Sequence, residues 1–110
     1  MKRTNLGELE EIILLIVASL EDQAYGILIQ EEVEKQCDRK ISISSVHNVL
    51  HRLEEKGFLK AAYSDPTPER GGKRKLIFTL TAAGKKAMED ARSLRDKLWN
   101  NIPTFKLSNS

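Results

Sequence analysis

The segment SISSVHNVLHRLEEKGFLKAAY, residues 42–63, changes its hydrophobic period at Gly57. Before this glycine an apolar residue recurs at every third or fourth position, which predicts a helix with one buried face. These apolar positions are Val46, Val49, Leu50 and Leu53. Ser42 is a predicted N-cap, because its hydroxyl accepts a free first-turn N–H, and Gly57 is a predicted C-terminal stop. The segment therefore predicts a helix that leads directly into a strand.

Two strands and a final helix are predicted next. FLKAAY, residues 58–63, and KLIFTL, residues 75–80, read as strands joined by the polar, turn-rich loop SDPTPERGGKR. Thr81 is the predicted N-cap of a last helix, and Pro103 is its predicted end. The apolar face of this helix consists of Ala87, Ala91, Leu94, Leu98 and Ile102.

Two helices are predicted before residue 42. Asn5 and Glu8 have the spacing of a capping pair for the first helix. Its helical period is carried by Leu6, Leu9, Ile13, Ile16 and Leu20. Further aliphatic residues make its middle apolar nearly all round, so we expect a second subunit to cover part of it.

The second predicted helix covers residues 25–37, with Ile29, Val33 and Cys37 on one face. Gly26 permits another helix to approach closely, and Ile41 is a candidate strand of one or two residues. The order is therefore helix, helix, short strand, helix, hairpin, helix. It predicts a mainly α (α+β) fold, a winged helix-turn-helix with an added C-terminal helix. We expect residues 1–80 to form a DNA-binding domain, residues 81–103 a dimerisation helix and residues 104–110 a flexible tail.

Composition and charge narrow the class of protein. A chain of 110 residues with 40% hydrophobic content fits one small domain. No apolar run approaches the roughly 20 residues that span a bilayer. Glutamates interrupt the apolar start, so we expect no signal peptide and no membrane association. The single cysteine, Cys37, suits a reducing cytoplasm and is most simply a small core residue.

The net charge of +2 conceals an asymmetry between the two parts of the chain. Residues 1–40 contain five basic and nine acidic residues, a net charge of −4, so residues 41–110 carry +6. This division predicts a basic half that faces a polyanion and an acidic half that packs or assembles.

Two groups of residues are predicted to contact DNA. The polar side of helix 42–57 offers hydroxyl, amide and basic groups to phosphates and base edges. The basic residues around Gly71 and Gly72 lie at the loop of the predicted hairpin, beside a phosphate backbone. Tyr25 either packs or binds a phosphate. The full set is Tyr25, Ser44, Ser45, His47, Asn48, His51, Arg52, Arg70, Lys73, Arg74 and Lys75.

Other site chemistries have little support in the sequence. His47 and His51 are one helical turn apart, a spacing that binds metals, but no third ligand is evident. There is no nucleophile with a base, no phosphate-binding loop before a helix and no carboxylate pair at an obvious cleft. We therefore expect no enzyme activity, no metal and no cofactor.

A second predicted surface is the dimer interface or the wall of a ligand cavity. Trp99, the only tryptophan, lies against the partner's first helix or at the rim of such a cavity. The residues assigned to this surface are Leu9, Ile13, Ile16, Leu94, Leu98 and Trp99.

Five motifs in order resemble the PadR family of bacterial transcription regulators. They are LGELEEIIL, YGILI, LHRLEEKGFL, GGKRK and LTAAG, and the resemblance runs from about Leu6 to Ala91. The short chain is similar to the compact branch with one helix after the wing. The resemblance implies a dimeric repressor whose recognition helix enters the major groove and whose wing contacts flanking backbone. In some relatives a pocket at the dimer centre also binds flat aromatic compounds.

The chain departs from the family pattern in the recognition helix. A Gly-Thr-Leu-Tyr-Pro-like run is replaced by Ser44, Ser45, Val46, His47 and Asn48, which keeps the hydroxyl at Ser45 alone. The family commonly has a pair of aromatic residues late in the wing, and this chain has Ile77-Phe78 there, which keeps only one aromatic ring. We therefore do not assign to this chain the operator preference that the family signature carries.

The sequence favours a homodimeric, cytoplasmic DNA-binding repressor with a pseudo-palindromic operator. Relief by a planar aromatic compound stays open, because nothing in the sequence separates a ligand-responsive from a ligand-blind protein. Two alternatives stay open. One is a winged helix used for protein–protein assembly, and the other is a ligand-binding dimer without a DNA function.

Overall fold

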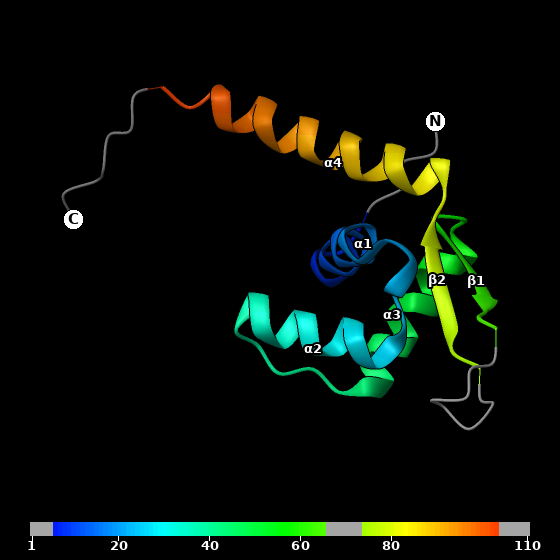
Figure 1. Cartoon of the computed structure of the whole chain (residues 1–110). Helices are drawn as coiled ribbons and strands as arrows, with labels where there is room; N and C mark the ends of the chain where they lie inside the picture. The colour runs from blue at the N-terminus through cyan, green and yellow to red at the C-terminus, as the bar shows by residue number, and fades with distance from the viewer. Residues whose placement is uncertain (1–5, 66–73, 104–110) are drawn as a thin grey trace.

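The computed structural model describes residues 6–65 and 74–103. In chain order the elements are α1 (Glu8–Leu20), η1 (Glu21–Gln23), α2 (Gly26–Cys37), α3 (Ile43–Glu55), β1 (Leu59–Tyr63), β2 (Leu76–Leu80) and α4 (Ala82–Asn100). Figure 1 shows α1 in the middle, with α2 on one side of it and α4 on the other. The order and the two-stranded hairpin confirm the predicted winged helix-turn-helix with a helix after the wing.

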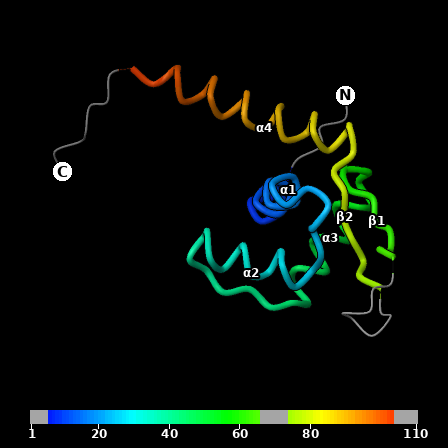
Figure 2. The backbone as a smooth tube through the Cα atoms, viewed as in Figure 1, coloured from blue at the N-terminus to red at the C-terminus, as the bar shows by residue number. Residues whose placement is uncertain are grey.

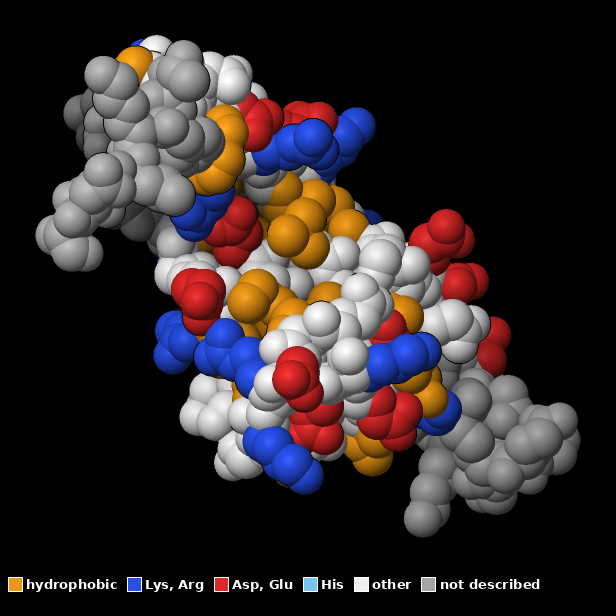
Figure 3. Space-filling view, turned by 90° about the vertical axis from the view of Figure 1, so that its left-hand side faces the viewer, with side chains coloured by type: hydrophobic (Ala, Val, Ile, Leu, Met, Phe, Trp, Pro, Cys, Tyr) orange, Lys and Arg blue, Asp and Glu red, His pale blue; other side chains and the backbone are white. Residues whose placement is uncertain are grey.

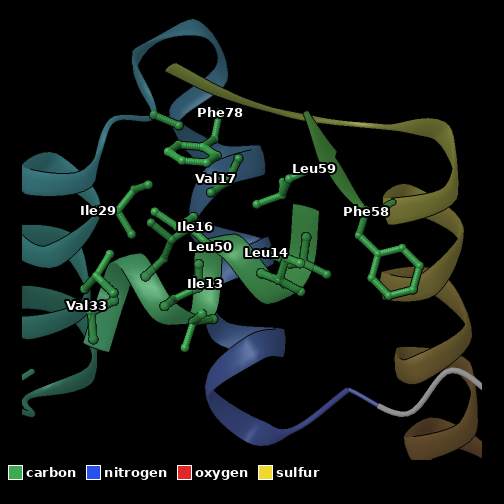
Figure 4. Packing of buried hydrophobic residues seen from close by; sticks show 14 residues of the cluster. Ile13, Leu14, Ile16, Val17, Ile29, Val33, Leu50, Phe58, Leu59 and Phe78 are labelled. Atoms are coloured by element: carbon green, nitrogen blue, oxygen red, sulfur yellow. The ribbon is translucent and has the colours of Figure 1, made fainter. Parts of the chain in front are cut away.

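The hydrophobic core is built from α1, α2, α3 and the hairpin (Figure 4). All four apolar residues predicted to face inward from α3 are buried. They meet Ile13, Leu14 and Val17 of α1, Ile29 and Val33 of α2, and Phe58, Leu59 and Phe78 from the hairpin region. The helical period of residues 46–53 therefore predicted the inward face of α3 correctly.

The two ends of α3 also agree with the sequence. The Ser42 hydroxyl accepts the Ser45 N–H at 3.1 Å, as an N-cap does. Gly57 has φ of +80°, a left-handed conformation that glycine adopts without steric cost. The chain leaves the helix there and enters β1 two residues later.

The hairpin is bonded on both sides of β2. It pairs antiparallel with β1 in a register that places Leu59 opposite Leu80 and Tyr63 opposite Leu76. On its other side, the Phe78 N–H donates to the Ala24 carbonyl at 2.8 Å. This bond fixes the wing relative to the segment that starts α2.

The start of α4 is locked against the turn after α3. The Thr81 hydroxyl accepts the Gly84 N–H at 3.0 Å and donates to the Gly57 carbonyl at 2.6 Å. A Cβ at Gly84 would overlap the carbonyl oxygen of Phe58, so only glycine fits this approach. The orientation of α4 is thus set within its first turn.

The predicted cap of α1 is wrong. The N-cap is Gly7, and the carboxylate of Glu10 accepts the Gly7 N–H at 2.8 Å. Asn5 lies outside the described residues, while Glu8 is the first residue of the helix and pairs with Arg39 at 2.8 Å. The acidic residue three positions after the cap has the predicted role, but the cap is two residues later.

The predicted short strand at Ile41 is also wrong. Figure 2 shows the backbone after α2 running back along that helix before α3 begins. Two α2 side chains satisfy the backbone of Ile41 there: Gln30 Nε2 donates to its carbonyl at 2.9 Å, and Glu34 accepts its N–H at 3.2 Å. Because side chains bind both polar groups, no partner strand is needed.

Ile13 and Ile16 do not lie on an outer surface, contrary to their assignment to the dimer or ligand interface. Their exposed fractions are 0% and 6%, and both belong to the core of the single chain. Leu9 is half-buried against the same core. The nearly continuous apolar surface of α1 is therefore covered mainly by α2, α3, β2 and α4 of its own chain.

No helix in the described ranges has the length and apolar character to span a membrane.

Candidate nucleic-acid interface

The outer side of α3 carries every residue that was predicted to contact DNA from this helix. They are Ser44, Ser45, His47, Asn48, His51 and Arg52, and all are exposed. They divide into three groups, because 100° separates neighbours on a helix. Ser44, Asn48 and His51 lie opposite the buried stripe, and His47 lies on the side that meets Gly26 of α2. Ser45 and Arg52 share the remaining side, from which Arg52 reaches Glu10 of α1.

The first turn of α3 gathers three hydroxyl groups. Ser42 Oγ donates to Ser45 Oγ at 2.9 Å and lies 3.2 Å from Ser44 Oγ. Asn48 follows one turn later, and its amide has no hydrogen bond within the described part of the chain. An amide can pair with both N6 and N7 of adenine, and hydroxyls bind either phosphate or base edges. The N-terminal half of α3 therefore presents exposed hydroxyl and amide groups, the kinds of group that can bind phosphates and base edges.

His47 joins α3 to the start of α2. A Cβ placed on Gly26 would lie 2.9 Å from His47 Cε1 and 3.7 Å from Ile43 Cδ1. The imidazole therefore lies almost against the Gly26 backbone, and the close helix approach predicted at Gly26 is confirmed. The start of α2 and the first turns of α3 form one surface.

The base of the wing joins the same surface through Tyr25, the N-cap of α2. The Lys75 ammonium nitrogen lies 3.7 Å from the centroid of the Tyr25 ring. Arg74, the next residue toward the loop, is exposed. The predicted contacts Arg70 and Lys73 lie outside the described residues. Lys75, Tyr25, Gly26 and His47 thus form a continuous path from the wing to the recognition helix.

Arg52 is in a different environment from the other predicted contacts. Its Nε lies 3.5 Å from Glu10 Oε2, and Lys56 Nζ binds both oxygens of this carboxylate at 3.0 and 2.9 Å. Glu10 is 7% exposed and is the buried charged residue of the described chain. It anchors the C-terminal end of α3 to the start of α1, which leaves Arg52 with part of its charge already paired.

The ionisation of Glu10 follows from these contacts. Burial disfavours the charged carboxylate and raises its pKa, but the Gly7 N–H and the cations of Lys56 and Arg52 outweigh burial. Together they hold the pKa of Glu10 below its ordinary value of 4.5. Glu10 is therefore an anion at neutral pH.

The pair of Glu10 and Lys56 was not predicted from the sequence, although the spacing of Glu10 within α1 indicated that its carboxylate would be buried. Glu10, Ile13, Leu14 and Val17 have the i, i+3, i+4, i+7 spacing of one helix face, which places a carboxylate on the buried stripe of α1. A buried charge needs a partner. What the sequence does not reveal is that the partner is the C-cap residue of α3, 46 residues away.

The other two acids in the first turn of α1 are paired as well. Glu8 binds Arg39 after α2, and Glu11 binds Arg95 of α4 at 2.7 Å. With Lys56 at the C-cap of α3, three separate parts of the chain thus pair with one turn of α1. Part of the acidic surplus of residues 1–40 is therefore paired inside the chain. Figure 1 shows α4 along one side of the molecule and the loop end of β1 and β2 at the opposite side.

The second half of α4 exposes an apolar surface. Leu98 is 56% exposed and Trp99 is 63% exposed, and Leu94 and, two residues after the helix, Ile102 are exposed to a similar degree. Figure 3 views the molecule from the side toward which α4 extends and shows hydrophobic side chains gathered there among charged ones. Of the residues assigned to the dimer or ligand surface, Leu94, Leu98 and Trp99 are therefore accessible.

Metal chemistry has no site in the described ranges. No group of three His, Cys, Asp or Glu side chains there is placed to hold an ion. His51 instead has Glu54 as a neighbour, with 3.8 Å between Nδ1 and Oε1.

A winged helix with a basic hairpin base and a polar recognition helix defines a class of DNA-binding proteins. The sequence model of the "Transcriptional regulator PadR-like family" matches residues 13–90. The chain belongs to this family, and it is accordingly a DNA-binding transcriptional regulator and not an enzyme. The predicted resemblance is confirmed at the level of the family.

The chain is also similar to individual proteins and solved structures. A protein of Lysinibacillus sphaericus, named "Uncharacterized protein X", is 35% identical over 81 residues, which cover 72% of this chain and 70% of that protein. A PadR family transcription regulator from Clostridium difficile R20291 has a TM-score of 0.66 at 25% identity, covering 86% of this chain and 96% of that one. A PadR-like regulator from Bacillus cereus has a TM-score of 0.68 at 19% identity, covering 89% and 93%, and shows the shared fold.

Proposed function

We propose that the protein is a homodimeric repressor that binds a pseudo-palindromic operator. The observation that carries this proposal is the continuous path from Lys75 through Tyr25 and Gly26 to His47, at the other end of the molecule from the exposed apolar half of α4. One end of the chain is suited to DNA and the other to a second copy. In this proposal residues 1–80 form the DNA-binding domain and residues 81–103 the dimerisation helix, in the cytoplasm.

Dimerisation determines the form of the operator. Leu94, Leu98 and Ile102 continue the face of α4 that packs on the body through Ala87, but they extend past the body and are exposed. A second copy that covers them relates the two recognition helices by a twofold axis. Two such helices bind half-sites about one DNA turn apart, roughly 34 Å.

The two parts of the interface contribute differently to binding. The cations of the wing, including Arg74 and Lys75, neutralise phosphates and give an affinity that is independent of sequence and falls with salt. In this proposal Ser44, Ser45 and Asn48 at the start of α3 contact base edges and supply the choice of sequence. Arg52 has the smaller role, because Glu10 already pairs with it.

Fluorescence anisotropy tests the DNA-binding part of the proposal. The probe is duplex DNA from upstream of the protein's own gene, at two salt concentrations with non-specific competitor. We expect specific binding that weakens with salt, and Arg74→Glu should weaken it at least about tenfold. Lys85→Glu is the matched control, since Lys85 is exposed in the first turn of α4, at the far end of β2 from Arg74.

Equal effects of Arg74→Glu and Lys85→Glu would contradict the assignment of the wing. Binding without any preference over the competitor would contradict the operator. Repression itself is tested by a reporter gene placed behind the bound fragment, whose expression should fall when the protein is produced.

Dimerisation is tested by sedimentation of the purified chain. The wild-type protein should sediment as a dimer, and Leu98→Glu should raise the dimer dissociation constant by about a hundredfold, because it buries a carboxylate in an apolar contact. A Lys97→Glu control changes the neighbouring exposed side chain. A wild-type monomer at micromolar concentration would contradict the proposal.

The regulatory signal in this proposal is a planar aromatic compound bound beside Trp99. A tryptophan that is 63% exposed next to exposed leucines offers a flat apolar surface to such a ring. The ligand would change the distance between the two recognition helices. We expect planar aromatic compounds to quench the Trp99 fluorescence and to weaken operator binding, and no change of either across a broad panel would remove the ligand from the proposal.

A further inference from the structure

The backbone of Lys75, at the base of the wing, is held by two hydrogen bonds. Its N–H donates to Ser64 Oγ at 2.9 Å, and its carbonyl accepts the Ser64 N–H at 2.7 Å. Both backbone groups are therefore bonded one residue beyond the end of β1. The side chain leaves from a fixed point on the wing.

The Tyr25 ring that meets the Lys75 ammonium group is fixed as well. Tyr25 is the N-cap of α2, with extended backbone angles of −119° and 161°, and its carbonyl accepts the Ile29 N–H at 2.9 Å. The preceding carbonyl, that of Ala24, accepts the Phe78 N–H of β2 at 2.8 Å. The ring and the ammonium group are thus attached to two elements that are bonded to each other.

The contact between the two side chains leaves the cation able to bind an anion. At 3.7 Å from the ring centroid the ammonium group lies over the π face, where the ring quadrupole attracts it. An ammonium group has three N–H donors, and the ring occupies one side of it. Among the described residues no carboxylate lies within ion-pair distance of Lys75. The remaining donors are directed away from the ring.

The surroundings of this cation also favour an anion. The first backbone N–H groups of α2 begin at Gly26, next to Tyr25, and give the helix a partial positive charge there. A free lysine stem must lose rotamer freedom when it binds a phosphate. In this chain the Tyr25 ring has already restricted the Lys75 stem.

We propose that Tyr25 is a positioning residue, whose ring holds the Lys75 ammonium group ready to bind a phosphate of duplex DNA. The proposal rests on the proposed function and assigns the role of Tyr25 to its ring and not to its hydroxyl. A direct hydrogen bond from the hydroxyl to a phosphate is the competing account. The two accounts predict opposite results for Tyr25→Phe, which keeps the ring and removes the hydroxyl.

The experiment measures affinity for a duplex of random sequence as a function of salt, by fluorescence anisotropy with the full chain. No operator is needed, since phosphate contacts are blind to sequence. We expect Lys75→Met to weaken binding about fivefold at low salt and to lower the salt slope by about 0.9 per protomer. Tyr25→Phe should stay within about twofold of wild type, whereas Tyr25→Leu should weaken binding by about threefold or more.

The double variant gives the decisive comparison. If the ring acts through the cation, Tyr25→Leu with Lys75→Met should bind no more weakly than Lys75→Met alone, because coupled residues are not additive. Lys85→Met is the matched control and should leave both the affinity and the salt slope unchanged. Independent, additive losses from the two single changes would overturn the proposal, as would a Tyr25→Phe variant as weak as Tyr25→Leu.

A measurement on the free protein covers the case in which Tyr25→Leu fails to fold. The methylene group next to the Lys75 ammonium group is bonded to a nitrogen that lies 3.7 Å from the Tyr25 ring centroid. We therefore expect the ring to shift the NMR signals of its protons upfield in wild type and in Tyr25→Phe. Signals at ordinary lysine positions in both proteins would overturn the proposal. Two outcomes separate this proposal from the proposed function. A wild-type protein without salt-dependent DNA binding would contradict both the proposed function and the role of Tyr25. Strong DNA binding that Lys75→Met leaves unchanged would contradict the role of Tyr25 alone.

Discussion

Helices α1 and α4 have similar apolar patterns but are used differently. Each has a stripe of aliphatic residues, and the sequence assigned both to a contact with a partner. The chain buries Ile13 and Ile16 of α1 in its own core, yet it leaves Leu94 and Leu98 of α4 exposed. The hydrophobic period predicts that a face will be covered, but it does not predict which chain covers it.

The ion pairs of the two helices repeat this difference. The acids in the first turn of α1 bind residues from three other parts of the chain: Arg39 after α2, Lys56 at the C-cap of α3 and Arg95 within α4. Two pairs of α4, Lys86 with Asp90 and Arg92 with Asp96, lie within the helix itself. The first turn of α1 therefore links several parts of the domain through ion pairs. Helix α4 is attached mainly at its start and extends outward.

The largest expected effect compares one aliphatic residue from each helix. Ile13→Ala removes a fully buried side chain from the core and should lower the free energy of unfolding by about 4 kcal/mol at any protein concentration. Leu98→Ala should cost under about 0.5 kcal/mol where the chain is a monomer. At concentrations that form the proposed dimer its effect should grow, because association stabilises the folded chain by mass action.

Urea unfolding at two protein concentrations measures both effects. A loss for Leu98→Ala that is as large as that for Ile13→Ala and independent of concentration would show that α4 is buried within one chain. The difference between the two helices would then disappear.

The next effect concerns the attachment of α4. Gly84→Ala places a methyl group against the Phe58 carbonyl oxygen and 2.8 Å from Leu80 Cδ1. The carbonyl is backbone and cannot turn aside, so we expect a loss of about 3 kcal/mol from overpacking. Ala83→Gly, an exposed change in the same turn, is the control and should cost about 1 kcal/mol through helix propensity alone. Urea midpoints measure both, and a stable Gly84→Ala protein would mean that the start of α4 can move.

Much of the fold was predictable because local physics determines it. The caps at Ser42 and Thr81, the stop at Gly57 and the buried stripe of α3 each depend on residues within one or two turns. The strands also follow from local alternation and turn residues, and both were placed to within one residue. Family motifs then identified the class of protein.

The cap of α1 was mispredicted by two residues, a local error, but the other mispredicted features depend on partners outside their own segment. Ile41 forms no strand because Gln30 and Glu34 return to bind its backbone. Ile13 is covered by its own chain, and a single helix period carries no information on that choice. At the candidate interface, the contact of Lys75 with Tyr25 joins residues 50 positions apart and was not foreseen, although both were assigned to DNA individually.

A smaller effect is expected at the ion pairs that link Glu10 of α1 to the end of α3. Glu10→Gln keeps an acceptor for the Gly7 N–H but removes the charge that binds Lys56 and Arg52. We expect a loss of about 2 kcal/mol at pH 7, below the usual cost of breaking a fully buried pair, because Lys56 reaches water. Glu32→Gln, an exposed pair partner within α2, is the control and should change little.

The same variant has a predicted pH dependence. The pKa of Glu10 lies below its ordinary value of 4.5 in the folded protein, so its stabilising effect is fully present above pH 4.5 and is lost as the pH falls through the folded value. The stabilities of wild type and Glu10→Gln should therefore converge in acid. Urea unfolding between pH 7 and pH 3 measures this, and a constant difference across the range would show that the carboxylate charge is not the cause.

The smallest effect is expected at the ion pair that links α4 to α1. Arg95 binds Glu11 at 2.7 Å, but the arginine is exposed, so water and salt screen the attraction and holding both side chains costs entropy. We expect Arg95→Gln and Glu11→Gln to leave the urea midpoint unchanged within error at physiological salt, alone or together. A loss comparable to that of Glu10→Gln would mean that this pair, and not the Gly84 contact, holds α4 against the body. The second half of α4 would then belong to the rigid domain, and its exposed leucines would need another explanation than a partner chain.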